Sequence, residues 1–128
     1  MNKVVKFGGS SLADAGQFKK VGAIIHDDSS RRYVIPSAPG KRFPSDIKVT
    51  DMLYQCYAKA VADMDFSELL TAIKDRYQEI IDELQLDLSL DKEFEIISEN
   101  FKNKIGKCYA ASRGEYLNGI VMASYLGF

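Results

Sequence analysis

The segment Lys3-Val4-Val5-Lys6-Phe7-Gly8-Gly9-Ser10-Ser11-Leu12 decides the fold of this chain. Its valine-rich run predicts a buried strand, its Gly-Gly pair allows a sharp turn, and its serines predict the start of a helix. Glycines leave room for an anion beside backbone N–H groups, and the positive end of a following helix would strengthen the attraction. Lys6 would add a mobile positive charge. Gly8, Gly9 and Ser10 therefore predict either a phosphate-binding turn or a plain strand-to-helix connection.

Length and composition limit the classes of function that are open to this chain. With 128 residues and a formal net charge of −1, the chain is predicted to form one domain at most, and it lacks the basic field that favours nucleic acid or acidic membranes. It contains neither an apolar stretch long enough to span a bilayer nor the pattern of a signal peptide. We expect a soluble, cytoplasmic protein that binds neither nucleic acid nor a membrane.

Cysteine and histidine offer little chemistry in this sequence. Cys56 and Cys108 lie far apart, with no other cysteine or histidine at ligand spacing, so we expect free thiols rather than a disulfide or a zinc site. The single histidine, His26, falls at the polar end of a predicted helix, where it would interact with the helix dipole. No metal-binding residue is therefore assigned.

A βαβ unit is predicted at the start of the chain. Apolar residues recur at helical spacing at Phe18, Val21, Gly22 and Ile25. Asp14 would cap this helix, residues 27–30 would end it, and residues 31–36 form a second strand closed by proline. Because parallel strands open at the same sheet edge, the turn at 8–10 and the loop at 37–40 should be neighbours.

The rest of the chain is predicted to be helical. Residues 37–48 form a long loop, and we favour a solvated charge pair over a phosphate contact for its Lys41-Arg42. Apolar spacing then predicts helices from 49 to about 63, from 65 to 84, from about 90 to 105, and from 112 onward. Asp65-x-x-Glu68 has the form of a capping box. The second and third of these helices would form a hairpin beside the sheet.

The Ser112-Arg113-Gly114-Glu115 segment has two interpretations. In one, Ser112 and Glu115 form a capping box, in which each satisfies N–H groups at a helix start. Alternatively, Glu115 is a carboxylate near the ligand-binding edge of the sheet that holds an ammonium group. The residues alone leave both open.

The chain is expected to be part of a larger domain. Gly127-Phe128 predicts a helix C-cap followed by the first residue of another strand. Two strands do not cover the faces of so many amphipathic helices. An open sheet edge would also favour self-pairing.

Three segments together resemble aspartate kinase, a member of the amino-acid kinase superfamily. They are Val5–Leu12, Val34–Gly40 and Ser112–Leu117, and their order and surroundings match across essentially the whole chain. The resemblance implies an α/β fold, the three-layer α/β/α amino-acid kinase (carbamate kinase-like) fold. It would be incomplete here, with mainly parallel strands and an inserted helical hairpin.

The resemblance also implies an activity, with ATP and Mg2+ as cofactors. The γ-phosphoryl group would pass to the side-chain carboxylate of L-aspartate, the first step towards lysine, threonine and methionine. Lys6 would stabilise the moving phosphoryl group, and the ATP phosphates would be bound by Lys6, Phe7, Gly8, Gly9 and Ser10. The full-length protein would be a homo-oligomer.

The other substrate would be bound by residues further along the chain. The resemblance implies that Ser37 and Thr50 bind aspartate and that Glu115 grips its ammonium group. An aspartate carboxylate has an unperturbed pKa of about 3.9, so it is already ionised at neutral pH and needs no general base.

The chain also departs from the family. Aspartate kinases continue well past this length, with a nucleotide-binding half and regulatory domains, so we expect the 128-residue chain alone to have little or no activity. One alternative is another amino-acid kinase, acting on glutamate, carbamate or a nucleotide, which the Arg113-Gly114-Glu115 segment argues against. The other is a non-catalytic binding or assembly module.

Overall fold

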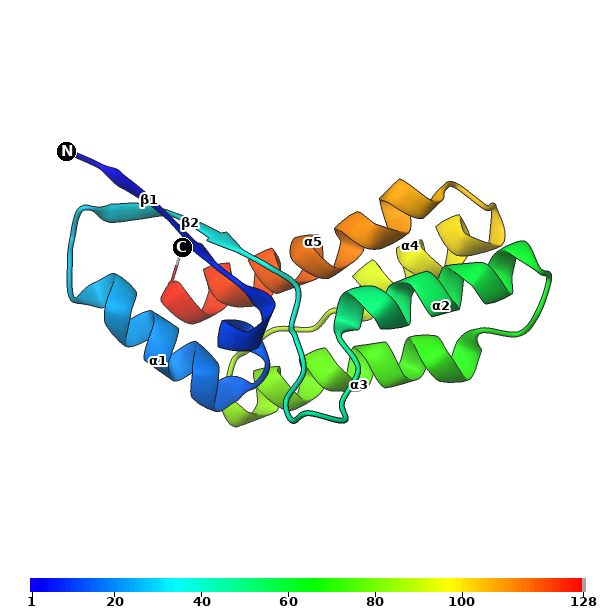
Figure 1. Cartoon of the computed structure of the whole chain (residues 1–128), viewed down its shortest axis with the longest axis horizontal. Coiled ribbons are helices and arrows are strands. Elements are labelled where there is room, and N and C mark those ends of the chain that lie inside the picture. Colours follow the sequence, from blue (N-terminus) through cyan, green and yellow to red (C-terminus); the bar gives the residue numbers. More distant parts are fainter. Residues whose placement is uncertain (128) are drawn as a thin grey trace.

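A computed structural model describes residues 1–127, a mixture of helices and strands (Figure 1). Its elements are β1 (Lys3–Phe7), a short 3-10 helix (Gly9–Leu12), α1 (Ala15–His26), β2 (Arg31–Pro36), α2 (Val49–Val61), α3 (Ser67–Glu83), α4 (Asp91–Lys102) and α5 (Lys107–Leu126). The strands and α1 lie at one end of the molecule, and α2 to α5 extend to the other end. The predicted strand residue Phe128 lies outside the described residues.

The described strands form a parallel pair, as the βαβ prediction requires. The prediction that β1 is buried was wrong, because the sheet is covered on one face only by the described residues. Phe7 and Val34 pack against the core, whereas Val4, Tyr33 and Ile35 are exposed, Val4 by 64%. Alternation along a strand thus leaves half of the apolar side chains of the sheet exposed.

The segment after β1 differs from the prediction. The α-helix begins at Ala15, and a 3-10 turn occupies the serine region instead. Asp14 caps α1 as predicted, accepting a hydrogen bond of 2.9 Å from the Gln17 amide. The Asp14 carboxylate therefore satisfies one of the free N–H groups at the positive end of α1. His26 is the last residue of α1 and is exposed, as expected.

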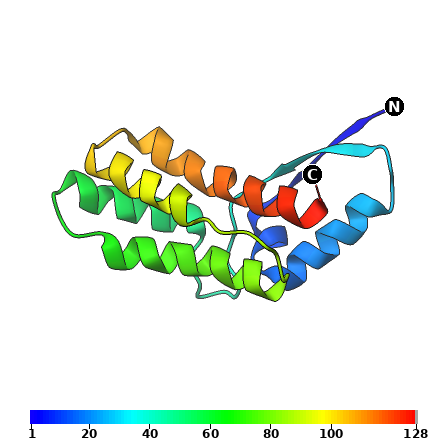
Figure 2. The same ribbon diagram turned by 180° about the vertical axis from the view of Figure 1, so that it is seen from behind.

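The helices α2 to α5 pack together, as the view from behind also shows (Figure 2). α2 contacts α3, α4 and α5, so the predicted hairpin of α3 and α4 is part of a bundle rather than a pair laid beside the sheet. The fully buried side chains at its centre include Leu53, Tyr77, Phe101 and Leu117. The apolar stripes predicted from the sequence thus face one another.

Two predicted boundaries near α5 were wrong. α4 ends at Lys102, and Ile105, which was expected on its apolar face, is 56% exposed. Gly106, at a φ of 146°, precedes α5, which begins at Lys107 rather than at Ser112. The Ser112 hydroxyl donates to the backbone carbonyl of Tyr109 at 2.8 Å. Ser112 lies inside the helix, and the predicted capping box is not formed.

The start of α3 lies closer to its predicted position than the start of α5 does. The helix begins at Ser67, and the carboxylate of Asp65 accepts a hydrogen bond of 3.0 Å from the Ser67 amide. Asp65 therefore satisfies a helix-end N–H group from just before the helix. At the other end of the bundle, Gly127 caps α5 in the left-handed conformation, as predicted.

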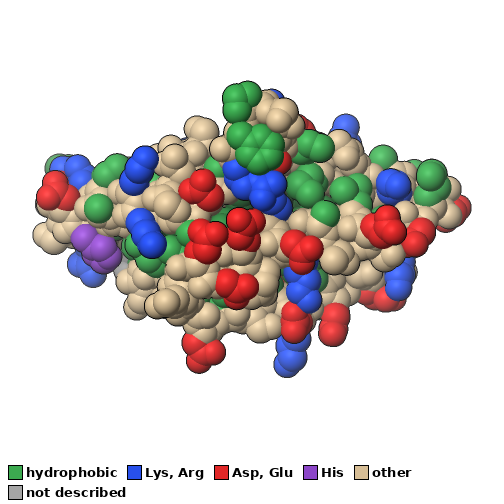
Figure 3. All heavy atoms as spheres, turned by 90° about the horizontal axis from the view of Figure 1, so that it is seen from below, with side chains coloured by type: hydrophobic (Ala, Val, Ile, Leu, Met, Phe, Trp, Pro, Cys, Tyr) green, Lys and Arg blue, Asp and Glu red, His purple; other side chains and the backbone are tan. Residues whose placement is uncertain are grey.

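The surface carries charges of both signs. On the face shown in Figure 3, acidic and basic side chains are interspersed. Neither sign predominates there, in keeping with the formal net charge of −1. Within residues 1–127, the helices are too short or too polar to cross a membrane.

Candidate functional site

The turn after β1 and the loop after β2 lie side by side, as predicted. The Ser37 amide donates to the Phe7 carbonyl at 3.1 Å, which continues the pairing of the strands by one residue. The Gly40 amide donates to the Gly9 carbonyl at 2.8 Å. Two segments far apart in sequence thus form one surface at the carboxyl edge of the sheet.

Glycine is required at both positions of this contact. A Cβ atom added to Gly9 would lie 2.9 Å from the Ala38 carbonyl oxygen, and one added to Gly40 would lie 2.7 Å from the Gly9 carbonyl carbon. Both distances are too short for a side chain, and the neighbours are backbone atoms that cannot move independently. The two glycines hold the loops at their present separation.

We therefore expect Gly40→Ala to destabilise the chain by about 1–3 kcal/mol, the usual cost of overpacking. Thermal unfolding should show a fall in Tm of roughly 3–10 °C. Gly119→Ala is the matched control, because a Cβ atom at Gly119 meets nothing within 4 Å. Equal Tm values for the two variants would show that the loops do not need this contact.

Gly8 is different, because nothing in the described protein requires a glycine there. Its φ of −75° and ψ of 169° are open to any residue, and a Cβ atom would meet nothing within 4 Å. Among residues 1–127, the amides of Gly9 and Ser10 have no hydrogen-bond acceptor. An open backbone with free N–H groups is what binding of a phosphate group needs.

Lys6 lies on β1, opposite Ile35 of β2, with an exposed side chain. In the part of the chain that the structure describes, its ammonium group forms no hydrogen bond or ion pair. It shares the exposed face of the sheet with Val4 and Ile35. The ammonium charge of Lys6 is therefore free to interact with a ligand. Lys6 takes no part in the contacts that join the loops to α5.

α5 lies directly against the loop that follows β2 (Figure 1). A Cβ atom added to Gly114 would lie 2.6 Å from the Cβ of Ala38, so the helix backbone itself contacts the loop. The side chain of Asn118 donates to the Ser37 carbonyl at 2.7 Å. These contacts bring Ser37 into the region of Glu115, which follows Gly114 in the chain.

The start of α2 joins the same region. The Val49 amide donates to the Pro39 carbonyl at 3.1 Å, so Thr50, which is partly buried, follows directly from the loop. Glu115 is exposed and lines a shallow hollow with Tyr54, which lies one turn after Thr50. The expectation that Glu115 lies at a helix start was wrong, because α5 begins eight residues earlier at Lys107.

Arg42, in the 37–48 loop, is engaged by carboxylates of the protein itself. Arg42 forms an ion pair of 2.7 Å with Asp46 and one of 3.3 Å with Glu79. The hydrogen bond from Arg42 holds the pKa of Asp46 well below its usual range. Arg42 is therefore held by two carboxylates, and the preference for a solvated pair over a phosphate contact stays a prediction for Lys41.

Two buried polar side chains at this site were not predicted from the sequence. Arg76 is 5% exposed and Asn118 is 0% exposed. Burial, followed by the charge of Arg42, lowers the pKa of Arg76. A signal existed: Arg76 falls three residues after Ile73 on the apolar stripe of α3, and Asn118 falls three residues before the buried Val121 of α5. A polar residue at such a position indicates a buried partner.

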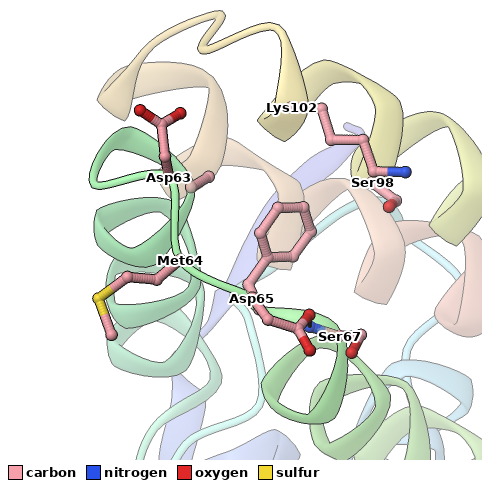
Figure 4. A pocket seen from close by; sticks show the side chains of 8 residues that line it. Asp63, Met64, Asp65, Ser67, Ser98 and Lys102 are labelled. Atoms are coloured by element: carbon pink, nitrogen blue, oxygen red, sulfur yellow. Dashed lines mark hydrogen bonds between the residues drawn. The ribbon is translucent and has the colours of Figure 1, made fainter.

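A larger hollow lies elsewhere, at the loop between α2 and α3 (Figure 4). It has a volume of about 450 Å³, with Asp63, Asp65 and Ser67 on one side and Ser98 and Lys102 of α4 on the other. None of the predicted site residues lines it. Among the described residues, no group of three or more His, Cys, Asp and Glu side chains is placed to hold a metal ion.

No family model matches this chain. It is 48% identical over 88 residues to aspartokinase 3 of Bacillus subtilis (strain 168), covering 69% of this chain and 19% of the relative. The chain thus spans about a fifth of that relative.

Solved structures match over nearly the whole chain. The aspartate kinase of Clostridium acetobutylicum, an allosteric enzyme, is 50% identical with a TM-score of 0.93, over 97% of this chain and 29% of that one. Aspartokinase III of Escherichia coli in complex with aspartate and ADP has a TM-score of 0.75 at 20% identity, over 99% of this chain and 29% of that one, which shows a shared fold. By sequence and by structure, the chain is therefore a homologue of one part of the aspartokinases.

Proposed function

We propose that this chain is the N-terminal part of the catalytic domain of an aspartate kinase, in the amino-acid kinase superfamily. The complete domain would have three α/β/α layers and transfer the γ-phosphoryl group of ATP to the β-carboxylate of L-aspartate. This reaction is the first step towards lysine, threonine and methionine. The homology to aspartokinases over 97% of this chain supports the proposal.

The observation that carries the proposal is the open backbone at Gly8. Neither its conformation nor its packing requires glycine, and the neighbouring Gly9 and Ser10 amides are free among the described residues. A ligand that approaches the backbone closely would explain all three features. We assign the ATP phosphates to this turn, from Phe7 to Ser10.

Lys6 has an electrostatic role in this proposal. The aspartate carboxylate is ionised at neutral pH, so the barrier arises because two anions must approach each other. The free ammonium group of Lys6 would offset that repulsion and stabilise charge on the transferring group. Mg2+ would add positive charge at the phosphates when bound, but we assign none of its ligands to the described residues.

Ser37, Thr50 and Glu115 would bind aspartate in this proposal. Ser37 and Thr50 lie at the two ends of the loop that joins β2 to α2, and α5 packs against that loop next to Glu115. In the described residues, the Glu115 carboxylate has no cationic partner. It is therefore free to accept hydrogen bonds from the ammonium group of the substrate.

The proposal extends to the rest of the protein. The solved relative is more than three times as long as the segment that matches this chain. We propose that the nucleotide-binding half and the regulatory domains lie outside these residues, and that the 128-residue chain by itself is inactive. The full-length enzyme would be cytoplasmic and homo-oligomeric.

A chimaera tests this function directly. The chain would replace the matching segment of the Clostridium acetobutylicum aspartate kinase, to which it is 50% identical. We expect the chimaera to phosphorylate aspartate with Mg-ATP, and the chain alone to show no turnover. A folded chimaera that binds nucleotide but does not phosphorylate aspartate would contradict the proposal.

A further inference from the structure

We propose that Asn118 and Arg76 are positioning residues that fix the loop after β2 so that it presents Ser37 to aspartate. The inference rests on the proposed function for its substrate. In the structure, two buried polar side chains, one on α5 and one on α3, hold this loop by its carbonyl oxygens.

Asn118 makes its contact from inside the core. The side chain is 0% exposed, and its Nδ2 atom donates to the Ser37 carbonyl at 2.7 Å. The Oδ1 atom is buried without a hydrogen-bond partner among residues 1–127. Burying an unpaired amide oxygen is unfavourable, and leucine would fill the position without that cost. The bond to Ser37 is what an asparagine supplies at this position and a leucine does not.

Arg76 holds the following part of the loop. Its Nη2 atom donates to the Gly40 carbonyl at 2.7 Å, and its Nη1 atom donates to the Ile47 carbonyl at 2.9 Å. The nearest carboxylate, on Asp46, is 3.7 Å from Nη1, and Nε is buried without a partner in the described structure. One planar guanidinium group thus fixes two carbonyls seven residues apart.

The placement of Asn118 links the loop to the carboxylate proposed for the substrate ammonium group. Asn118 and Glu115 lie three residues apart on α5, within one rigid helical turn. The Gly114 backbone, in contact with Ala38, sets how closely that turn approaches the loop. One helix therefore carries Glu115 and also fixes the loop that carries Ser37, so the separation of the two groups is determined by a single element.

Amide hydrogen exchange of the chain tests whether Asn118 and Arg76 fix the loop after β2. In Asn118→Leu we expect the Ser37 and Gly40 amides to exchange about tenfold faster or more, while those in the centre of α3 are unchanged. The Tm should change little, because leucine removes the unpaired Oδ1 atom but leaves the Ser37 carbonyl without its donor. Asn100→Leu is the matched control, since Asn100 donates to the Tyr109 hydroxyl at 2.8 Å and does not contact the loop.

Exchange that is unchanged at Ser37 and Gly40, or that accelerates equally at every amide, would overturn the proposal. If Asn118→Leu does not fold, Asn118→Ala gives the same test, because it removes the donor and adds no bulk. Arg76→Lys should accelerate exchange at Gly40 and at Val49, since one ammonium group cannot hold both carbonyls.

The effect on aspartate binding is tested in the chimaera, by comparing the variants Glu115→Gln and Asn118→Leu. We expect Asn118→Leu to raise the KM for aspartate about tenfold with little change in kcat, and Asn100→Leu to change neither. An unchanged KM in Asn118→Leu with a raised KM in Glu115→Gln would overturn the positioning role alone. If neither variant alters the KM, the proposed aspartate site itself has failed.

Discussion

Lys6→Ala is expected to lower the turnover of the chimaera by about 100- to 1,000-fold, the usual effect of losing one group that stabilises transition-state charge. The KM for aspartate should change by less than about threefold, because the role proposed for Lys6 is on the phosphoryl group as charge moves. Steady-state kinetics with aspartate and Mg-ATP measure both constants.

The expected fall in turnover would not come from a loss of stability. Lys6 is exposed and has no ion pair in the described part of the chain, so its replacement removes no structural contact. Lys20→Ala, an exposed lysine on α1, is the control for net charge. Unchanged turnover in Lys6→Ala would remove Lys6 from the mechanism.

Glu115→Ala is expected to weaken aspartate binding by about 30-fold or more, since a charge-assisted contact to the ammonium group is lost. Glu115→Gln should give a similar loss, because the amide keeps the shape and removes the charge. Isothermal titration calorimetry of the chimaera with aspartate measures the affinity directly.

The control for Glu115 is another exposed glutamate of the same bundle. Glu99→Gln on α4 also removes one negative charge, and Glu99 lies outside the candidate site. It should leave the affinity within about twofold, because exposed charges interact weakly with distant groups. Equal affinities for Glu115→Gln and Glu99→Gln would mean that Glu115 does not bind the ammonium group.

Much of the fold was predictable because it depends on local patterns. The valine-rich and Val34-Ile35 runs predicted the two strands, and the helical spacing of apolar residues predicted α1 to α4. The connection between the strands then required parallel pairing, which places the Gly9 and Gly40 loops together.

The errors came from ends of elements, where local signals compete. Ser112-x-x-Glu115 has the form of a capping box, yet α5 starts at Lys107 because Gly106 already provides the break from α4. In the same way, Ser10 and Ser11 lie in a 3-10 turn, and the Asp14 carboxylate fixes the start of α1 at Ala15. A capping motif shows where a helix can begin, and packing selects among the possible starts.

The sequence by itself determined the order of the elements, the parallel pairing of β1 with β2, and the glycine turn beside Lys6, because these depend on residue periodicity and backbone freedom. Tertiary structure alone decided that Arg76 and Asn118 are buried beneath the loop after β2, and that the Gly114 backbone contacts Ala38. Those contacts join residues that are 29 to 81 positions apart, and no local pattern specifies which distant carbonyl a buried donor will reach.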